Sequence, residues 1–190
     1  MAMPIAVPRY TIPDLYSLPD DGSRYELLNG VLLVTPAPLP AHQIVVERIV
    51  GALTHYLHAL SSVHVFSPGS VEIEPDVHLE PDILVVPVDQ LGAGIPEDTR
   101  WSALGAWWLA VEVSGRGSRV YDRDHKGPAY LALGVREVWR ADLRDRCLFV
   151  SRTGQPDLRQ DEQLVWHPPE LADPLVLEVP AVFAGITARG

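Results

Sequence analysis

Apolar residues in the first half of the chain recur at spacings that separate one long helix from several strands. Between residues 42 and 60 they fall at steps of three and four, which is the stripe of an amphipathic helix. The members of that stripe are Val45, Val46, Ile49, Val50, Leu53, Leu57 and Leu60. Three strands are predicted next, at residues 63–66, 71–74 and 83–86. The helix is expected to lie on one face of a sheet in which the last of these, a continuous apolar run, is central.

Two short runs near the start of the chain flank a turn signal. Residues 24–28 and 31–35 surround Asn29 and Gly30, and Asn-Gly is the pair that most readily adopts the positive φ angles of a two-residue hairpin turn. An N-terminal β-hairpin is therefore predicted. Before it, residues 11–18 predict a short helix with a threonine cap and a proline near its start.

The second half of the chain continues with strands and one further long helix. Residues 106–113 are a nearly unbroken apolar segment, typical of a strand buried on both faces. Residues 121–133 predict a helix that Gly134 closes, and strands are predicted at 135–141 and 147–152. The less regular tail predicts two strands and a short helix, at residues 163–166, 175–179 and 181–186. This order predicts an α/β fold with a mixed central β-sheet flanked by helices.

Length and composition narrow the class of protein. With 190 residues, 47% of them hydrophobic, the chain is expected to form a single domain over residues 1–190. The one cysteine, Cys147, excludes an internal disulfide and a cysteine metal cluster. Residues 1–8 lack the pattern of a signal peptide, and no apolar run approaches the ~18 residues that span a bilayer. A cytoplasmic protein without a membrane partner is expected.

The charge balance bears on nucleic-acid binding. The net charge of −10 would repel a phosphate backbone unless basic residues gather on one face. Such a face, built from Arg116, Arg119, Arg123 and Arg136, would favour a nucleic-acid substrate.

Two carboxylates stand beside the most apolar strands. Asp82 precedes the run 83–86, and Glu112 lies near the end of the run 106–113. Because an ionised carboxylate beside a buried strand needs a cation or several hydrogen bonds, a metal ion between the two is a candidate. Mg²⁺ prefers a few hard oxygen ligands and retains waters, so these carboxylates and the Val113 carbonyl would make an open site. Taken singly, each is better explained as a strand-end carboxylate satisfied by caps or water, since strand ends are often polar.

A lysine follows at a distance that suits a helix. Lys126 comes after Asp122 at the four-residue spacing that places both on one helix face. Near a metal, the lysine could orient or help deprotonate an attacking water and stabilise a phosphate. The alternative is a solvated lysine paired with Asp122.

In combination, these residues resemble a known family. The segments that carry the resemblance are residues 24–30, 80–86, 109–114, 122–126 and 130–139. They resemble the Uma-type family of restriction endonucleases, within the PD-(D/E)XK nuclease superfamily, over about residues 20–142. The resemblance implies a restriction-endonuclease-like core, Mg²⁺ (or Mn²⁺) as cofactor, DNA as substrate and a homodimer. The tail, residues 143–190, adds nothing to it.

The resemblance also implies roles for individual residues. Carried over by position, Asp82 and Glu112 are metal ligands, and Lys126 replaces the lysine that many superfamily members hold two residues after the acid. That place is Ser114 here.

Two further residues match the family pattern. Glu26 and His42 would lie at the rim of the site, Glu26 as a further metal or water contact and His42 as a proton carrier. A hairpin carboxylate and a helix-start histidine are the alternatives.

Three functions remain open on these grounds. The first is an Mg²⁺-dependent endonuclease that hydrolyses DNA phosphodiester bonds. The second is a non-catalytic binding or scaffold protein with a nuclease fold, which the acidic balance would permit. The third is a metal hydrolase of small phosphoesters.

Overall fold

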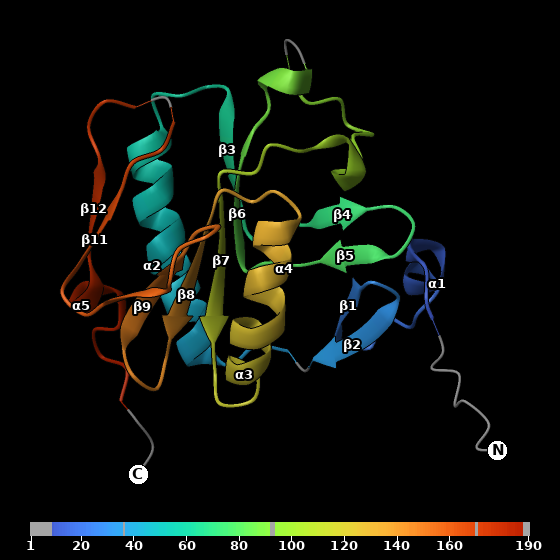
Figure 1. The fold of residues 1–190 in the computed structure, drawn as a ribbon, viewed down its shortest axis with the longest axis horizontal. Helices are drawn as coiled ribbons and strands as arrows, with labels where there is room; N and C mark the ends of the chain where they lie inside the picture. Colours follow the sequence, from blue (N-terminus) through green and yellow to red (C-terminus); the bar gives the residue numbers. More distant parts are fainter. Residues whose placement is uncertain (1–8, 36, 92–93, 170, 188–190) are drawn as a thin grey trace.

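A computed structural model describes residues 9–35, 37–91, 94–169 and 171–187. The expectation that residues 1–8 do not form a signal peptide lies outside the described residues. The largest sheet among these residues has six strands in the order β10-β9-β8-β7-β6-β3 (Figure 1). In chain order the strands are β3 (Val63–Phe66), β6 (Ile83–Pro87), β7 (Leu109–Ser114), β8 (Glu137–Asp142), β9 (Cys147–Ser151) and β10 (Leu158–Gln160). Strands β7 and β8 run parallel and the other neighbours antiparallel, which confirms the predicted mixed sheet.

The predicted hairpin is present, and it belongs to a second sheet of four strands in the order β2-β1-β5-β4. Strands β1 (Arg24–Leu28) and β2 (Val31–Thr35) pair in the predicted register, with φ angles of 50° at Asn29 and 77° at Gly30. The other two strands are β4 (Val71–Ile73) and β5 (Val77–Leu79). Strand β5 was not predicted, because a three-residue run is too short to show a period.

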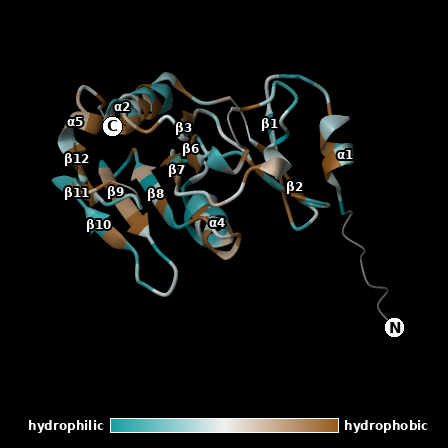
Figure 2. Cartoon of the chain, turned by 90° about the horizontal axis from the view of Figure 1, so that it is seen from above, coloured by the Kyte–Doolittle hydropathy of each residue, from teal (hydrophilic) through white to brown (hydrophobic). Residues whose placement is uncertain are grey.

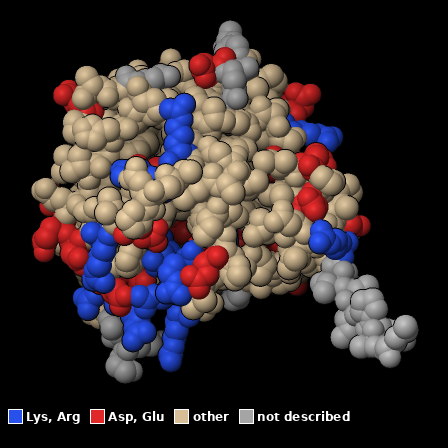
Figure 3. All heavy atoms as spheres, in the orientation of Figure 1, with Lys and Arg blue, Asp and Glu red and all other residues tan. Residues whose placement is uncertain are grey.

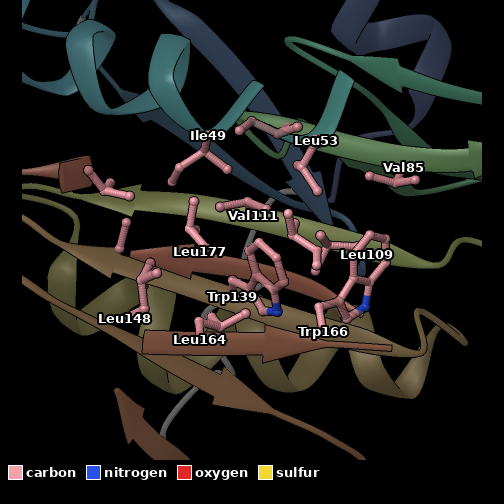
Figure 4. Packing of buried hydrophobic residues seen from close by; sticks show 14 of the residues in the cluster. Ile49, Leu53, Val85, Leu109, Val111, Trp139, Leu148, Leu164, Trp166 and Leu177 are labelled. Atoms are coloured by element: carbon pink, nitrogen blue, oxygen red, sulfur yellow. The ribbon is translucent and has the colours of Figure 1, made fainter. Parts of the chain in front are cut away.

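The long helix α2 (Pro40–Leu57) covers one face of the six-stranded sheet. It begins before the predicted start because Pro40 occupies the first turn, where its missing N–H costs nothing. The stripe residues Val45, Ile49 and Leu53 are fully buried. Figure 4 shows Ile49 and Leu53 directed at side chains of the sheet. The tail closes this core with strands β11 (Gln163–Trp166) and β12 (Leu175–Glu178) and helix α5 (Val179–Val182).

A broken helix covers the opposite face (Figure 2). It consists of α3 (Arg119–Tyr121), a π-helical segment, η3 (Asp122–Lys126), and α4 (Gly127–Ala132). The sequence predicts one regular helix over residues 121–133, and the π segment corrects this. Pro128 lacks the N–H that an α-helix needs at that place, so the turn before it widens. The N–H of Gly127 donates to the Asp122 carbonyl, five residues earlier.

Other predicted boundaries shift for local reasons. The strand expected at residues 106–113 begins only at Leu109, because Ala106 has a φ of 54° that no strand allows. Helix α1 (Ile12–Tyr16) has the predicted threonine cap and ends earlier than expected. The short terminal helix predicted at residues 181–186 lies instead at α5. None of the described helices combines the length and apolar character needed to cross a bilayer.

Candidate functional site

The two predicted carboxylates lie opposite each other on adjacent strands. Strands β6 and β7 pair with Ile83 opposite Val111, so Asp82, just before β6, faces the position of Glu112. Both side chains are buried, at 3% exposure for Asp82 and 4% for Glu112. Along β7, Leu109, Val111 and Val113 point to the α2 core, whereas Glu112 points to the face that α4 covers. The sheet register therefore brings the two acids to one place.

Asp82 accepts three hydrogen bonds. Its Oδ1 accepts one from Arg24 Nη1 at 2.8 Å, and its Oδ2 accepts one from the backbone N–H of Val113 at 2.8 Å. His42 Nε2 lies 3.0 Å from the same Oδ2. Burial alone would raise the pKa of Asp82, but His42, Arg24 and the Val113 N–H together lower it to about 2. Asp82 is therefore ionised across the physiological range.

Glu112 is held by a lysine and a tyrosine. Its Oε1 lies 2.6 Å from Lys126 Nζ and accepts a hydrogen bond of 2.6 Å from the Tyr130 hydroxyl. Lys126 Nζ also lies 2.7 Å from Glu26 Oε1, so one ammonium bridges two carboxylates from different elements. The second partner of Glu26 Oε1 is the backbone N–H of Glu80, at 2.8 Å.

The charges in this cluster do not balance. Burial raises the pKa of Glu112 well above its usual value, although Lys126 opposes the shift. Asp122 also has a raised pKa, chiefly from burial, although it accepts a hydrogen bond of 2.8 Å from the Ser114 hydroxyl. Burial would lower the pKa of Lys126, but Glu112, Glu26 and Asp122 more than offset it and raise that pKa. The cluster therefore holds a charged lysine and remains short of positive charge.

The structure places the five candidate residues together and corrects two expectations. Lys126 is 3% exposed, so the alternative of a solvated lysine paired with Asp122 is wrong. Glu26 is 2% exposed and lies inside the cluster, not at its rim. His42 is closer to the expected rim, with 14% of its side chain exposed.

Sequence reasoning missed Arg24 as a partner of Asp82 and Tyr130 as a partner of Glu112. Arg24 belongs to a hairpin far from Asp82 in the sequence, and no local spacing relates the two. Tyr130 lies one helical turn after Lys126, a four-residue step that places both side chains on one face and could have indicated this contact. Both residues belong to the segments that carry the family resemblance, but neither was assigned a role.

The fold is similar to that of a solved structure. A solved structure described as a putative nuclease belonging to DUF820 from Anabaena variabilis ATCC 29413 is similar over 94% of this chain and 99% of that chain. Its TM-score is 0.74 and its sequence identity is 18%, so the two share a fold. The chain thus shares the mixed α/β fold of that structure. No curated protein sequence matches it.

The particular family follows from the sequence itself. The model of the Uma2 family, described as "Putative restriction endonuclease", matches residues 12–188. The chain therefore belongs to the Uma2 family, and the match extends the resemblance through the tail.

Proposed function

We propose that the chain is a metal-dependent endonuclease that hydrolyses DNA phosphodiester bonds at the Asp82–Glu112 pair. The single observation that supports this most is that Asp82 and Glu112 are buried at facing positions of two adjacent strands, with the charged Lys126 in contact with Glu112. Membership of the Uma2 family supports the reaction class.

The residues present fit Mg²⁺ or Mn²⁺. Burial, and after it the neighbouring carboxylates, raise the pKa values of Glu112 and Asp122, and a divalent cation beside them would favour their ionised forms. Among the described residues, no group of three or more His, Cys, Asp or Glu side chains is arranged to hold a metal ion. Asp82, Glu112 and the Val113 carbonyl would therefore hold it together with water, as Mg²⁺ sites commonly do. When bound, the ion would supply the charge that polarises a phosphodiester.

Lys126 would act on the phosphate as a cation. Its raised pKa keeps the ammonium protonated at neutral pH, so it is suited to orient a water and to stabilise charge, and not to remove a proton. Glu26 and the Tyr130 hydroxyl would hold the lysine and Glu112 in place. His42 would orient Asp82 through its Nε2 atom. The other ring nitrogen of His42, Nδ1, is buried and has no hydrogen-bond partner among the described residues, so the contact with Asp82 is the one that this ring makes there.

A plasmid-nicking assay with and without Mn²⁺ tests the proposal. We expect metal-dependent cutting by the native chain and a loss of about 10²-fold or more in Asp82→Asn, Glu112→Gln and Lys126→Met. The first two variants should also lose the rise in melting temperature that Mn²⁺ gives the native chain, whereas Lys126→Met should keep it.

The same assay separates the alternatives. Full cutting by Glu112→Gln would refute the site. DNA binding without any metal-dependent cutting would favour the non-catalytic scaffold, and hydrolysis of bis(p-nitrophenyl) phosphate without plasmid cutting would favour a hydrolase of small phosphoesters.

A further inference from the structure

Two loops lie together at the end of the sheet where Glu112 is found. Because β7 and β8 run parallel, their carboxyl ends meet at one edge. The loop of residues 115–118 follows β7, and the turn of residues 143–146 follows β8. The N–H of Leu143 donates to the Ser114 carbonyl at 3.2 Å, which joins the two segments. Figure 1 shows both at the lower end of the sheet, the loop beneath β7 and α3 and the turn beneath β8 and β9.

The acidic residues of this edge are already paired. Asp142 and Asp145 both form ion pairs with Arg119, that of Asp142 at 2.7 Å. Three neighbouring arginines are exposed, and in the described part of the chain they have no carboxylate partner. They are Arg116 in the loop and Arg144 and Arg146 in the turn. Arg119 pairs with both aspartates and Arg140 pairs with Asp142 as well, so the other guanidinium groups remain available.

The sequence hypothesis named a different basic face. Arg123 pairs with Asp124 at 2.6 Å, and Arg136 lies before β8, at the opposite end of that strand. The four arginines 116, 119, 123 and 136 therefore do not form one face. Figure 3 instead shows Lys and Arg side chains gathered over the lower left of the molecule, in the direction of α3 and β9.

Local structure fixes the turn and leaves the loop adaptable. Asp142 Oδ1 accepts hydrogen bonds from the N–H groups of Arg144, at 3.1 Å, and Asp145, at 3.0 Å, and this holds the turn. Arg116 stands between two glycines whose Cβ positions would meet nothing within 4 Å. Arg144 and Arg146 therefore lie on a backbone turn that hydrogen bonds hold, whereas the backbone beside Arg116 can adjust. This combination suits a nucleic-acid backbone, whose phosphates change position from one sequence to another.

We propose that Arg116, Arg144 and Arg146 form a basic edge that binds the phosphate backbone of DNA and delivers it to the Asp82–Glu112 pair. This inference rests on the proposed function, because it takes DNA as the substrate. Guanidinium groups bind phosphate oxygens in a bidentate manner, and a chain with a net charge of −10 repels DNA elsewhere on its surface. Because the basic edge contacts phosphates and not bases, it binds DNA without sequence preference.

The test compares two triple variants with the same change in charge. One is Arg116→Ala, Arg144→Ala and Arg146→Ala; the control is Arg9→Ala, Arg100→Ala and Arg136→Ala, at exposed arginines outside the two loops. Binding of a fluorescein-labelled DNA duplex is measured in EDTA over a range of salt concentrations, so that no cutting occurs. The slope of log affinity against log salt should fall in magnitude by roughly 0.9 per lost contact, or about 2 to 3 for the first variant. The control should keep the native slope.

Each outcome of this experiment supports or overturns the basic edge, whether or not the protein cleaves DNA. Equal slopes for the two triple variants would overturn the basic edge, and so would a native chain that does not bind the duplex. A loss confined to the first variant supports the basic edge even if the native chain never nicks plasmid, in which case only the proposed reaction fails. Melting temperatures of both variants near that of the native chain show that folding is unchanged.

Discussion

Lys126 keeps its charge in a place where burial would ordinarily remove it. An ammonium group taken out of water loses several kcal/mol of solvation, of the order that lowers the pKa of an isolated buried lysine by about 3 to 5 units. Here Glu26 and Glu112 lie within 2.7 Å, and the attraction of these groups reverses the shift. We therefore propose an electrostatic role for this lysine in place of proton removal from water.

Asp82 gives a prediction about acid stability. Its pKa of about 2 lies below the ordinary value of an aspartate carboxyl, so the ionised form stabilises the fold. The contribution, about 2 kcal/mol, is fully present above pH ~4 and is lost as the pH falls through about 2. We expect the free energy of unfolding in urea of the metal-free native chain to fall by this amount between about pH 5 and pH 1, and Asp82→Asn to lack that component.

An exposed aspartate provides the matched control. Asp98→Asn should leave the native pH dependence unchanged, because Asp98 lies on the surface. If Asp82→Asn and the native chain lost stability in parallel over this range, the hydrogen bonds from Arg24, His42 and Val113 would not be holding an ionised carboxylate.

The π segment determines that the charged side chains of Asp122 and Lys126 in the broken helix α3–η3–α4 point toward the sheet. Asp122 and Lys126 are both buried, at 5% and 3% exposure. The close turn requires Gly127, since a Cβ there would meet the Asp122 carbonyl oxygen at 3.2 Å. The spacing of the two charged residues alone would have fitted a surface helix equally well.

The hairpin turn gives a prediction about glycine. Gly30 has a φ of 77°, and a Cβ there would lie 3.3 Å from Arg9 Cβ, so Gly30→Ala should destabilise the protein by about 1 to 2 kcal/mol. Gly51 lies in the interior of α2 with nothing within 4 Å of an added Cβ, so Gly51→Ala should stabilise by about 0.5 to 1 kcal/mol. Urea unfolding of both variants measures the two changes. The same sign for both would contradict this account.

At the scale of the whole molecule, the homodimer remains a prediction. Strand β2 is an edge strand of the four-stranded sheet and exposes 52% of Val31 and 53% of Val34, which suits pairing with a second copy. Light scattering should give twice the chain mass of 20.9 kDa, and Val34→Lys should shift the mass toward that of one chain. A single-chain mass for the native protein at all working concentrations would count against the dimer.

Local pattern was enough to predict much of the architecture from the sequence. Local patterns, which involve residues a few positions apart, predicted the helical stripe of α2, the Asn29-Gly30 turn and the apolar strands β6 and β7. Hydrophobic periodicity and turn-forming residues are patterns of this kind. The positions of Asp82 and Glu112 beside those strands were visible for the same reason. Strand β5 and the π segment were not visible, because a three-residue strand and a widened turn leave little local signal.

The amino-acid sequence by itself determined which residues form helices and strands and which charged groups stand beside buried strands. Only the tertiary structure decided the partners of those charges: Arg24 with Asp82, Lys126 with both Glu26 and Glu112, and Asp142 with Arg119. Each of these pairs joins residues of two different elements or loops. Their geometry follows from sheet register and helix packing, and no spacing along the sequence encodes it. The same register placed the arginines of two separate loops at one edge.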